Sequence, residues 1–175
     1  MLPIRPRKPF MTSLRSPRPA TRRALVAAAA TAALLLAAGA AQADGRMLPS
    51  RPLKAWQDEC AACHIAFPPA LLPAASWKRV MNGLDKHYGV DAAMDAQTTA
   101  QIAAWLQSEA GTGKRAREEP AQDRITRSAW FVRKHDEVRA DAWKRASVKS
   151  PANCAACHTG AERGDYDEDN VRIPR

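Results

Sequence analysis

Every cysteine of the chain belongs to one of two copies of the same five-residue string. The copies are Cys60-Ala61-Ala62-Cys63-His64 and Cys154-Ala155-Ala156-Cys157-His158. Cys-x-x-Cys-His is the attachment motif of c-type haem, in which both thiols add to the vinyl groups of the porphyrin and the histidine binds the iron. No thiol remains for a disulfide or a nucleophile. The motifs therefore predict two covalently bound haem c groups, with His64 and His158 as proximal ligands.

Two alternatives would use the same cysteines. Two Cys-x-x-Cys pairs are also the ligand set of a four-cysteine zinc site, and a single pair is the redox motif of thioredoxin-like proteins. The first pair begins at Cys60 and the second only at Cys154, far beyond the spacing within a zinc ribbon, and a histidine follows each pair. No βαβ pattern surrounds either of them. Spacing and context therefore favour haem.

The chain has only two further histidines, His87 and His135, and each falls on the apolar face of an expected helix. The interval from His64 to His87 equals the interval from His135 to His158, with the order of motif and second histidine reversed. An isolated histidine on an apolar face is more often a core residue, but here two irons each need a sixth ligand. We therefore predict that His87 and His135 complete bis-histidine coordination of both haems.

Met81 is the competing ligand for the first haem. It lies on the same expected helical face as His87, and methionine would raise the reduction potential relative to histidine. No methionine occurs between residues 101 and 175, so the second haem has His135 or an open site. The economical pairing joins His64 to His87 and His135 to His158. A crossed pairing between the two halves stays open.

Residues 1–43 have the three parts of a secretory signal peptide. They contain seven basic and no acidic residues, an apolar run over 24–40, and Ala41-Gln42-Ala43 as a cleavage site. The apolar run is at the short limit for a membrane span. We expect cleavage before Asp44, export to a bacterial periplasm, and no stable membrane insertion of the mature protein. Met11 is an alternative start.

The net charge of +9 comes mostly from this leader. Residues 44–175 contain 20 basic and 18 acidic side chains, so nothing in the mature chain points to a nucleic-acid partner. Two charged patches remain, a basic one over residues 114–117 and an acidic one over residues 165–169. Such patches are usually solvated surface, and their functional alternative is electrostatic docking of a transient redox partner.

The elements expected to position these ligands are helices, because no stretch shows the sustained alternation of a strand. Helices are expected over 54–64, from an N-cap at Ser76 to a stop at Gly89, over 98–109, and from an N-cap at Ser128 through Ala142. Prolines predict a loop over 65–75, and polar residues without periodicity predict a linker over 111–124. Five tryptophans offer apolar surface suited to haem pockets or to an ordinary core.

The sequence thus predicts a mainly α, small two-domain c-type cytochrome with one covalent haem per domain. Residues 1–43 would be the signal peptide, 44–112 the N-terminal haem domain and 113–175 the C-terminal haem domain. The mature chain is small for two cofactors, so buried haem faces must supply much of the core.

Several blocks of the mature chain resemble the dihaem cytochrome c family of bacterial periplasmic electron carriers. These blocks are Glu59–Pro69, Leu84–Gly89, Trp130–His135, Asn153–His158 and Gly164–Asp169. The resemblance implies two haem domains, the first similar to a class I cytochrome c, with low-potential bis-histidine haems. It also implies electron donation to a small oxygen-binding monohaem cytochrome, with a membrane cytochrome b as upstream donor. A histidine replaces the distal methionine of the class I pattern, which puts an ordinary class I potential in doubt.

Two other function classes stay open. A dihaem peroxidase needs one haem with a vacant or releasable sixth site for hydrogen peroxide. A gas sensor needs a five-coordinate haem that binds nitric oxide or carbon monoxide. The chain is short for such an enzyme and offers a ligand for each iron, so we expect an electron carrier with no catalytic residues rather than an enzyme.

Overall fold

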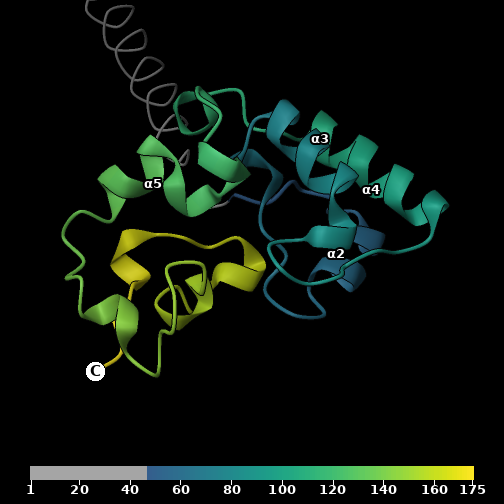
Figure 1. Ribbon diagram of the computed structural model, residues 1–175. Coiled ribbons are helices and arrows are strands. Elements are labelled where there is room, and N and C mark those ends of the chain that lie inside the picture. Colours follow the sequence, from purple (N-terminus) through teal and green to yellow (C-terminus); the bar gives the residue numbers. More distant parts are fainter. Residues whose placement is uncertain (1–46) are drawn as a thin grey trace, which may run out of the picture. The chain divides into compact units, whose positions relative to one another are not determined.

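The structure is a computed structural model that describes residues 47–175 (Figure 1). The predicted signal peptide, residues 1–43, lies outside the described residues. The described residues all belong to one compact unit. Within this unit, the division into haem domains at residue 112 stays a prediction. None of the described helices is both long enough and apolar enough to cross a membrane.

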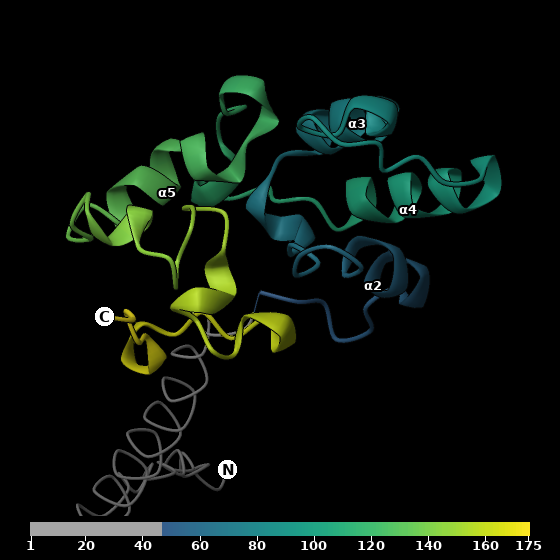
Figure 2. The same ribbon diagram turned by 60° about the horizontal axis from the view of Figure 1, so that its bottom comes forward.

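Three α-helices build the N-terminal half of this unit: α2 (Lys54–Cys60), α3 (Ala74–Asn82) and α4 (Ala96–Ser108). Helices α3 and α4 pack side by side, and α2 packs against α4 (Figures 1 and 2). Asp95 caps α4, because its carboxylate accepts a hydrogen bond of 2.9 Å from the backbone N–H of Thr98. The faces between these helices form the apolar core, which consists of Trp56, Leu72, Trp77, Met81, Leu84, Ile102 and Leu106.

Two of the expected helices agree closely with the structure over part or most of their length. The helix expected over 98–109 is confirmed as α4, which begins two residues earlier and ends one residue earlier. The helix expected over 54–64 begins at Lys54 but ends at Cys60, because the rest of the haem motif forms a turn.

The helix expected between Ser76 and Gly89 is wrong at both ends. Helix α3 begins three residues earlier, at Ala74, because the extended Pro73 precedes it and Ser76 is buried inside the helix instead of capping it. It ends at Asn82, since Gly83, a poor helix former, leaves the helical region. A 3-10 turn over Leu84–Lys86 follows. His87 therefore does not lie on a helix.

In the C-terminal half, the only α-helix among the described residues is α5 (Ala129–Lys134). Its predicted N-cap is confirmed, since the Ser128 hydroxyl accepts a hydrogen bond of 3.1 Å from the N–H of Phe131. The expected continuation through Ala142 is wrong, because the chain changes to successive i→i+3 turns after His135. Short 3-10 turns then carry the chain through the second motif, Cys154–Ala156, to the C-terminus.

The mainly α class is confirmed: no strand occurs in residues 47–175. The described chain has only two isolated β-bridges, one between His87 and Val90 and the other between His158 and Val171. Both bridges involve a histidine of a candidate site: the first closes the turn that follows His87, and the second joins His158 to the C-terminal tail.

The segment predicted as a linker, residues 111–124, packs against the N-terminal half. The N–H of Gly111 donates a hydrogen bond of 2.9 Å to the carbonyl of Leu72, and Ala116 is buried. A Cβ atom on Gly111 would clash with the carbonyl oxygen of Ala70 and would lie 2.5 Å from the Cβ of Ala116. This close approach requires glycine at position 111.

We therefore expect Gly111→Ala to lower the free energy of unfolding by about 1–3 kcal/mol, since the backbone at Ala70 must move to admit a methyl group. Gly113→Ala is the matched control, because its Cβ would meet nothing within 4 Å. We expect this control to change stability by less than about 1 kcal/mol. Urea unfolding of the haem-loaded proteins measures both, and equal losses in the two variants would contradict the close approach.

Candidate haem sites

The histidine of the first motif faces one of the two remaining histidines. The ring centroids of His64 and His87 are 6.2 Å apart, and the ring planes are nearly parallel at 21°. A metal–imidazole bond is about 2.0 Å long, so two such bonds plus half the width of each ring span roughly 6 Å. The separation of the two rings therefore fits a single metal ion between them.

His64 is oriented by its own chain. Its Nδ1 lies 2.6 Å from the carbonyl oxygen of Ile65, and its ring stacks on Phe67 at 4.8 Å between centroids. When Nδ1 carries the proton, it donates to that carbonyl and leaves Nε2 free as a metal ligand. The residues that follow the motif thus determine the ring orientation.

His87 is presented by a tight turn. The N–H of Val90 donates a hydrogen bond of 3.1 Å to the carbonyl of His87, and both central residues have positive φ, 50° at Tyr88 and 105° at Gly89. This is the pattern of a type I′ turn, which favours glycine at its second central position. The Tyr88 ring lies edge-on to His87, with 4.9 Å between centroids. Burial, followed by the charges of His64 and Arg124, lowers the pKa of His87.

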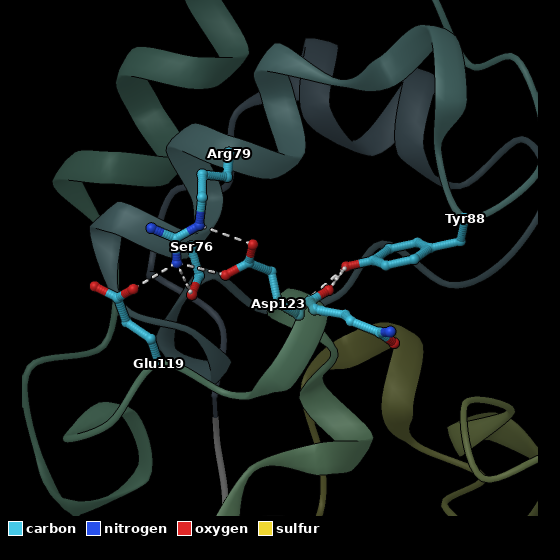
Figure 3. Close-up of polar contacts among 6 residues, drawn as sticks. Ser76, Arg79, Tyr88, Glu119 and Asp123 are labelled. Carbon is cyan, nitrogen blue, oxygen red and sulfur yellow. Dashed lines mark hydrogen bonds and ion pairs between the residues drawn. The ribbon is translucent and has the colours of Figure 1, made fainter.

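A polar cluster connects this turn to the segment predicted as a linker (Figure 3). The Tyr88 hydroxyl donates to the carbonyl oxygens of Asp123 at 2.9 Å and Gln122 at 3.3 Å. Arg79, on α3, binds both carboxylate oxygens of Asp123, at 2.9 and 2.7 Å, and also Glu119 at 2.6 Å. These hydrogen bonds from Arg79 lower the pKa of Asp123.

The same cluster stabilises a strained stretch of backbone. Gln122 and Asp123 have φ values of 58° and 53°, in the left-handed region that costs a residue other than glycine about 1–3 kcal/mol. The two-pronged ion pair with Arg79 and the hydrogen bonds from Tyr88 stabilise this conformation. The strain is therefore located where the C-terminal half contacts the first candidate site.

The second candidate site pairs His135 with His158. Their ring centroids are also 6.2 Å apart, but their planes are close to perpendicular, at 75°. The distance is the same as in the first site, so the second pair also fits one shared metal ion. The two sites therefore have the same ring separation and different ring orientations.

Helix α5 positions His135 as its C-cap. The ring stacks on Phe131 at 4.0 Å and 18°, and its Nδ1 lies 2.9 Å from the Phe131 carbonyl oxygen. Trp143 lies on another side of the ring, at 5.9 Å between centroids. Because the Phe131 carbonyl accepts the Nδ1 proton, Nε2 is left as the ligand atom.

His158 follows the 3-10 turn of the second motif. Its N–H donates a hydrogen bond of 2.8 Å to the carbonyl of Cys154, and its ring lies 5.2 Å from that of Tyr166. The His158 Nδ1 and the Tyr166 hydroxyl are buried and have no hydrogen-bond partner. Burial, followed by the charge of His135, lowers the pKa of His158, and burial raises the pKa of Tyr166.

A cavity of about 250 Å³ lies at this second site. Its lining combines both thiols of the motif, both imidazoles and several aromatic rings, and it includes Cys154, Cys157, His135, His158, Phe131, Trp130, Trp143 and Tyr166. Thiols, imidazoles and apolar walls are the groups that a covalent haem needs, and His158 and Tyr166, whose buried polar atoms lack partners, both line the cavity. The residues therefore fit haem c.

The cysteines fit thioether attachment better than a zinc site. All four are free, and no three His, Cys, Asp or Glu side chains in residues 47–175 come together as a metal site would require. Burial, followed by the charge of Glu59, raises the pKa of Cys60 to about 11, and burial raises that of Cys154 to about 11.

The structure brings His64 next to His87 and His135 next to His158, which is the pairing within each half of the chain. Among the described residues, no ring contact joins one pair to the other. Met81 lies in the apolar core between the helices, only 6% exposed. Trp56 and Trp77 also belong to this core, whereas Trp130 and Trp143 line the second cavity.

Sequence reasoning missed the neighbours that orient these rings, namely Phe67, Tyr88 and Tyr166. The Tyr-Gly pair directly after His87 is a local signal for the turn that presents this imidazole. No comparable sequence signal places Tyr166 next to His158, since that contact depends on the fold of the C-terminal tail.

The family model described as dihaem cytochrome c matches residues 56–166. The chain belongs to the dihaem cytochrome c family. It carries two covalently bound haem c groups, one on each Cys-x-x-Cys-His motif. No curated protein matches it.

Solved structures of dihaem cytochromes c are similar to the chain. The new dihaem cytochrome type c from Shewanella baltica is 37% identical, with a TM-score of 0.62, and the match covers 69% of this chain and 92% of that one. Two structures from Rhodobacter sphaeroides are 42% identical, with TM-scores of 0.57 and 0.60. The matches cover 68% of this chain and 99% and 98% of those chains.

The Arg79–Asp123 pair leads to a prediction on acid stability. We expect Asp123→Asn to lower the midpoint urea concentration of this dihaem cytochrome at about pH 7, because the amide loses the ion pair with Arg79. The pair lowers the folded-state pKa of Asp123, so its contribution is present above the unfolded-state pKa of about 3.9 and is lost as pH falls through the folded-state value.

Urea titrations of both proteins from about pH 7 to about pH 3 check this, and the difference between them should shrink at the acid end. Glu118→Gln is the matched control, since Glu118 is exposed in the same segment. A difference that stays constant over the whole pH range would show that the carboxylate charge of Asp123 does not matter.

Proposed function

We propose that the protein is an electron carrier in which both haems have bis-histidine coordination, His64 with His87 and His135 with His158. The observation that carries the proposal is the 6.2 Å separation of the ring centroids in both pairs. The bound haem supplies an iron that takes up and releases one electron. With an imidazole on each side, neither iron has a coordination position for a substrate.

The surrounding residues keep the imidazoles in place during the redox cycle. The carbonyls of Ile65 and Phe131 accept the Nδ1 protons of His64 and His135, which sets the tautomer and strengthens each nitrogen as a ligand. Phe131 and Trp143 pack around His135 and limit the access of water. Ligands that do not move when the iron changes its charge suit a carrier, since little of the protein has to reorganise.

The acceptor proposed for these electrons is a small oxygen-binding monohaem cytochrome, and the donor is a membrane cytochrome b. Both come from the resemblance to the family, as does a periplasmic location reached through the signal peptide of residues 1–43. Asp167 and Glu168 line the second cavity, so the acidic patch over 165–169 offers a charged surface for docking beside the second haem. Mixing the reduced protein with such a cytochrome and following its reduction tests this choice of acceptor.

The spectrum of the purified protein tests the carrier against the alternatives with an open site. We expect the oxidised protein to show two low-spin EPR signals of different shape. The ring planes differ by 21° in one pair and 75° in the other, and this angle sets how the iron d orbitals split. Carbon monoxide added after reduction should leave the optical spectrum unchanged. A large high-spin ferric signal, or a carbon monoxide adduct, would favour a peroxidase or a gas sensor.

Single substitutions assign the ligands. We expect His135→Ala to make one haem high-spin while the other stays low-spin, and His87→Ala to do the reverse, because each variant removes one ligand of one iron. Met81→Leu is the control and should leave both signals low-spin, since Met81 is a core residue. A histidine variant in which neither EPR signal changes would contradict the ligand assigned to it.

A further inference from the structure

Arg124 comes from the C-terminal half of the chain but lies at the first candidate site. Its guanidinium carbon is 4.2 Å from the centroid of the Tyr88 ring, the distance of a cation–π contact. The same ring lies edge-on to His87 at 4.9 Å. Arg124 forms no ion pair with any residue in 47–175. Its positive charge is therefore next to the turn that presents His87, with no carboxylate bound to it.

The backbone at this position separates two opposite charges that are adjacent in sequence. The Asp123 carboxylate points to Arg79 on α3, whereas its carbonyl oxygen accepts the hydrogen bond from Tyr88 (Figure 3). The left-handed conformation of Gln122 and Asp123 makes this arrangement possible. The Asp123 carboxylate is thus bound by Arg79, and Arg124 lies beside the Tyr88 ring without an ion pair of its own in the described part of the chain.

The charges at the second candidate site are mixed. Two cations, Arg115 and Lys134, line its cavity together with two carboxylates, Asp167 and Glu168. Arg115 lies 5.6 Å from the Trp130 ring, and Lys134 pairs with Glu168 at 3.7 Å. Opposite charges at close range largely cancel each other. Arg124 does not line this cavity, so its effect on the reduction potential should be specific to the first haem.

We propose that Arg124 raises the reduction potential of the first haem, and that Tyr88 and the Arg79–Asp123 pair position it for this role. The oxidised iron carries one more positive charge than the reduced iron, so a nearby cation that forms no ion pair disfavours the oxidised form. The proposal rests on the proposed function, in which His87 is a ligand of the first haem. It makes the C-terminal half a determinant of the potential in the N-terminal half.

The test is a redox titration of the full haem-loaded protein, followed at the haem absorption bands at low ionic strength. We expect Arg124→Gln to shift the potential of one haem to a more negative value and to leave the other unchanged. Arg124→Lys keeps the charge and should keep most of the wild-type potential. Added salt should reduce the difference between wild type and Arg124→Gln, because a partly exposed charge is screened.

Arg127→Gln is the matched control. It removes the same charge from a nearby residue of the same segment and should leave both potentials unchanged. The haem that shifts is assigned with His87→Ala, which removes the low-spin signal of the first haem. EPR of oxidised Arg124→Gln should still show both low-spin signals, so that a change of ligand does not account for the shift.

Four results would overturn the proposal: unchanged potentials in Arg124→Gln, a shift to more positive values, an equal shift in Arg124→Lys, or loss of a low-spin signal. Failure of the proposed function would be seen separately, as a high-spin signal or a carbon monoxide adduct in the wild-type protein. Low-spin wild-type haems together with unchanged potentials in Arg124→Gln would reject only the role of Arg124.

Discussion

The constraint on which the described structure depends is that two imidazole rings from separate segments must face each other at a separation of 6.2 Å, and must do so twice. Ordering side chains in this way costs conformational entropy, which other contacts must offset. Short turns and a short helix, rather than long helices, hold these rings in position. A tight turn presents His87, and the end of the short, capped helix α5 presents His135.

The two pairs are not copies of each other, although their motifs are identical. His64 and His87 are nearly parallel, and both are oriented by residues that follow them directly. His135 and His158 are close to perpendicular and lie among aromatic rings beside a cavity. Repetition of the motif therefore gives the same covalent chemistry in two different environments. Differences in ring angle, burial and nearby charge can give the two haems of one protein different reduction potentials.

The N-terminal and C-terminal halves of the chain are also joined by specific side-chain contacts, and not by a flexible linker alone. The Tyr88 hydroxyl and the Arg79 guanidinium bind the segment around Asp123, so the turn that carries His87 depends on residues of the C-terminal half. The strained backbone at Gln122 and Asp123 is tolerated because these contacts act together. A segment without apolar periodicity thus has a structural role, to which its polar contacts contribute.

Local patterns were reliable where the structure is decided locally. Ser128 was predicted as a cap because its hydroxyl bonds a backbone N–H within the first turn, and the helix around Ile102 and Leu106 was predicted from their spacing. The prediction failed for Ser76 and for the helix through His87. There, Pro73 and Gly83 determine the ends of α3, and the apolar spacing continues through a turn that is not helical.

The sequence by itself determined the covalent chemistry and the set of four candidate ligands, because these depend only on residue types and on spacing over a few positions. The tertiary structure decided which histidines face each other, at what angle, and which charges lie beside them. Those properties arise from contacts between residues far apart in the chain, such as Arg79 with Asp123 or Tyr88 with Arg124. Such contacts leave no period in the sequence, since they follow from how the helices and turns pack.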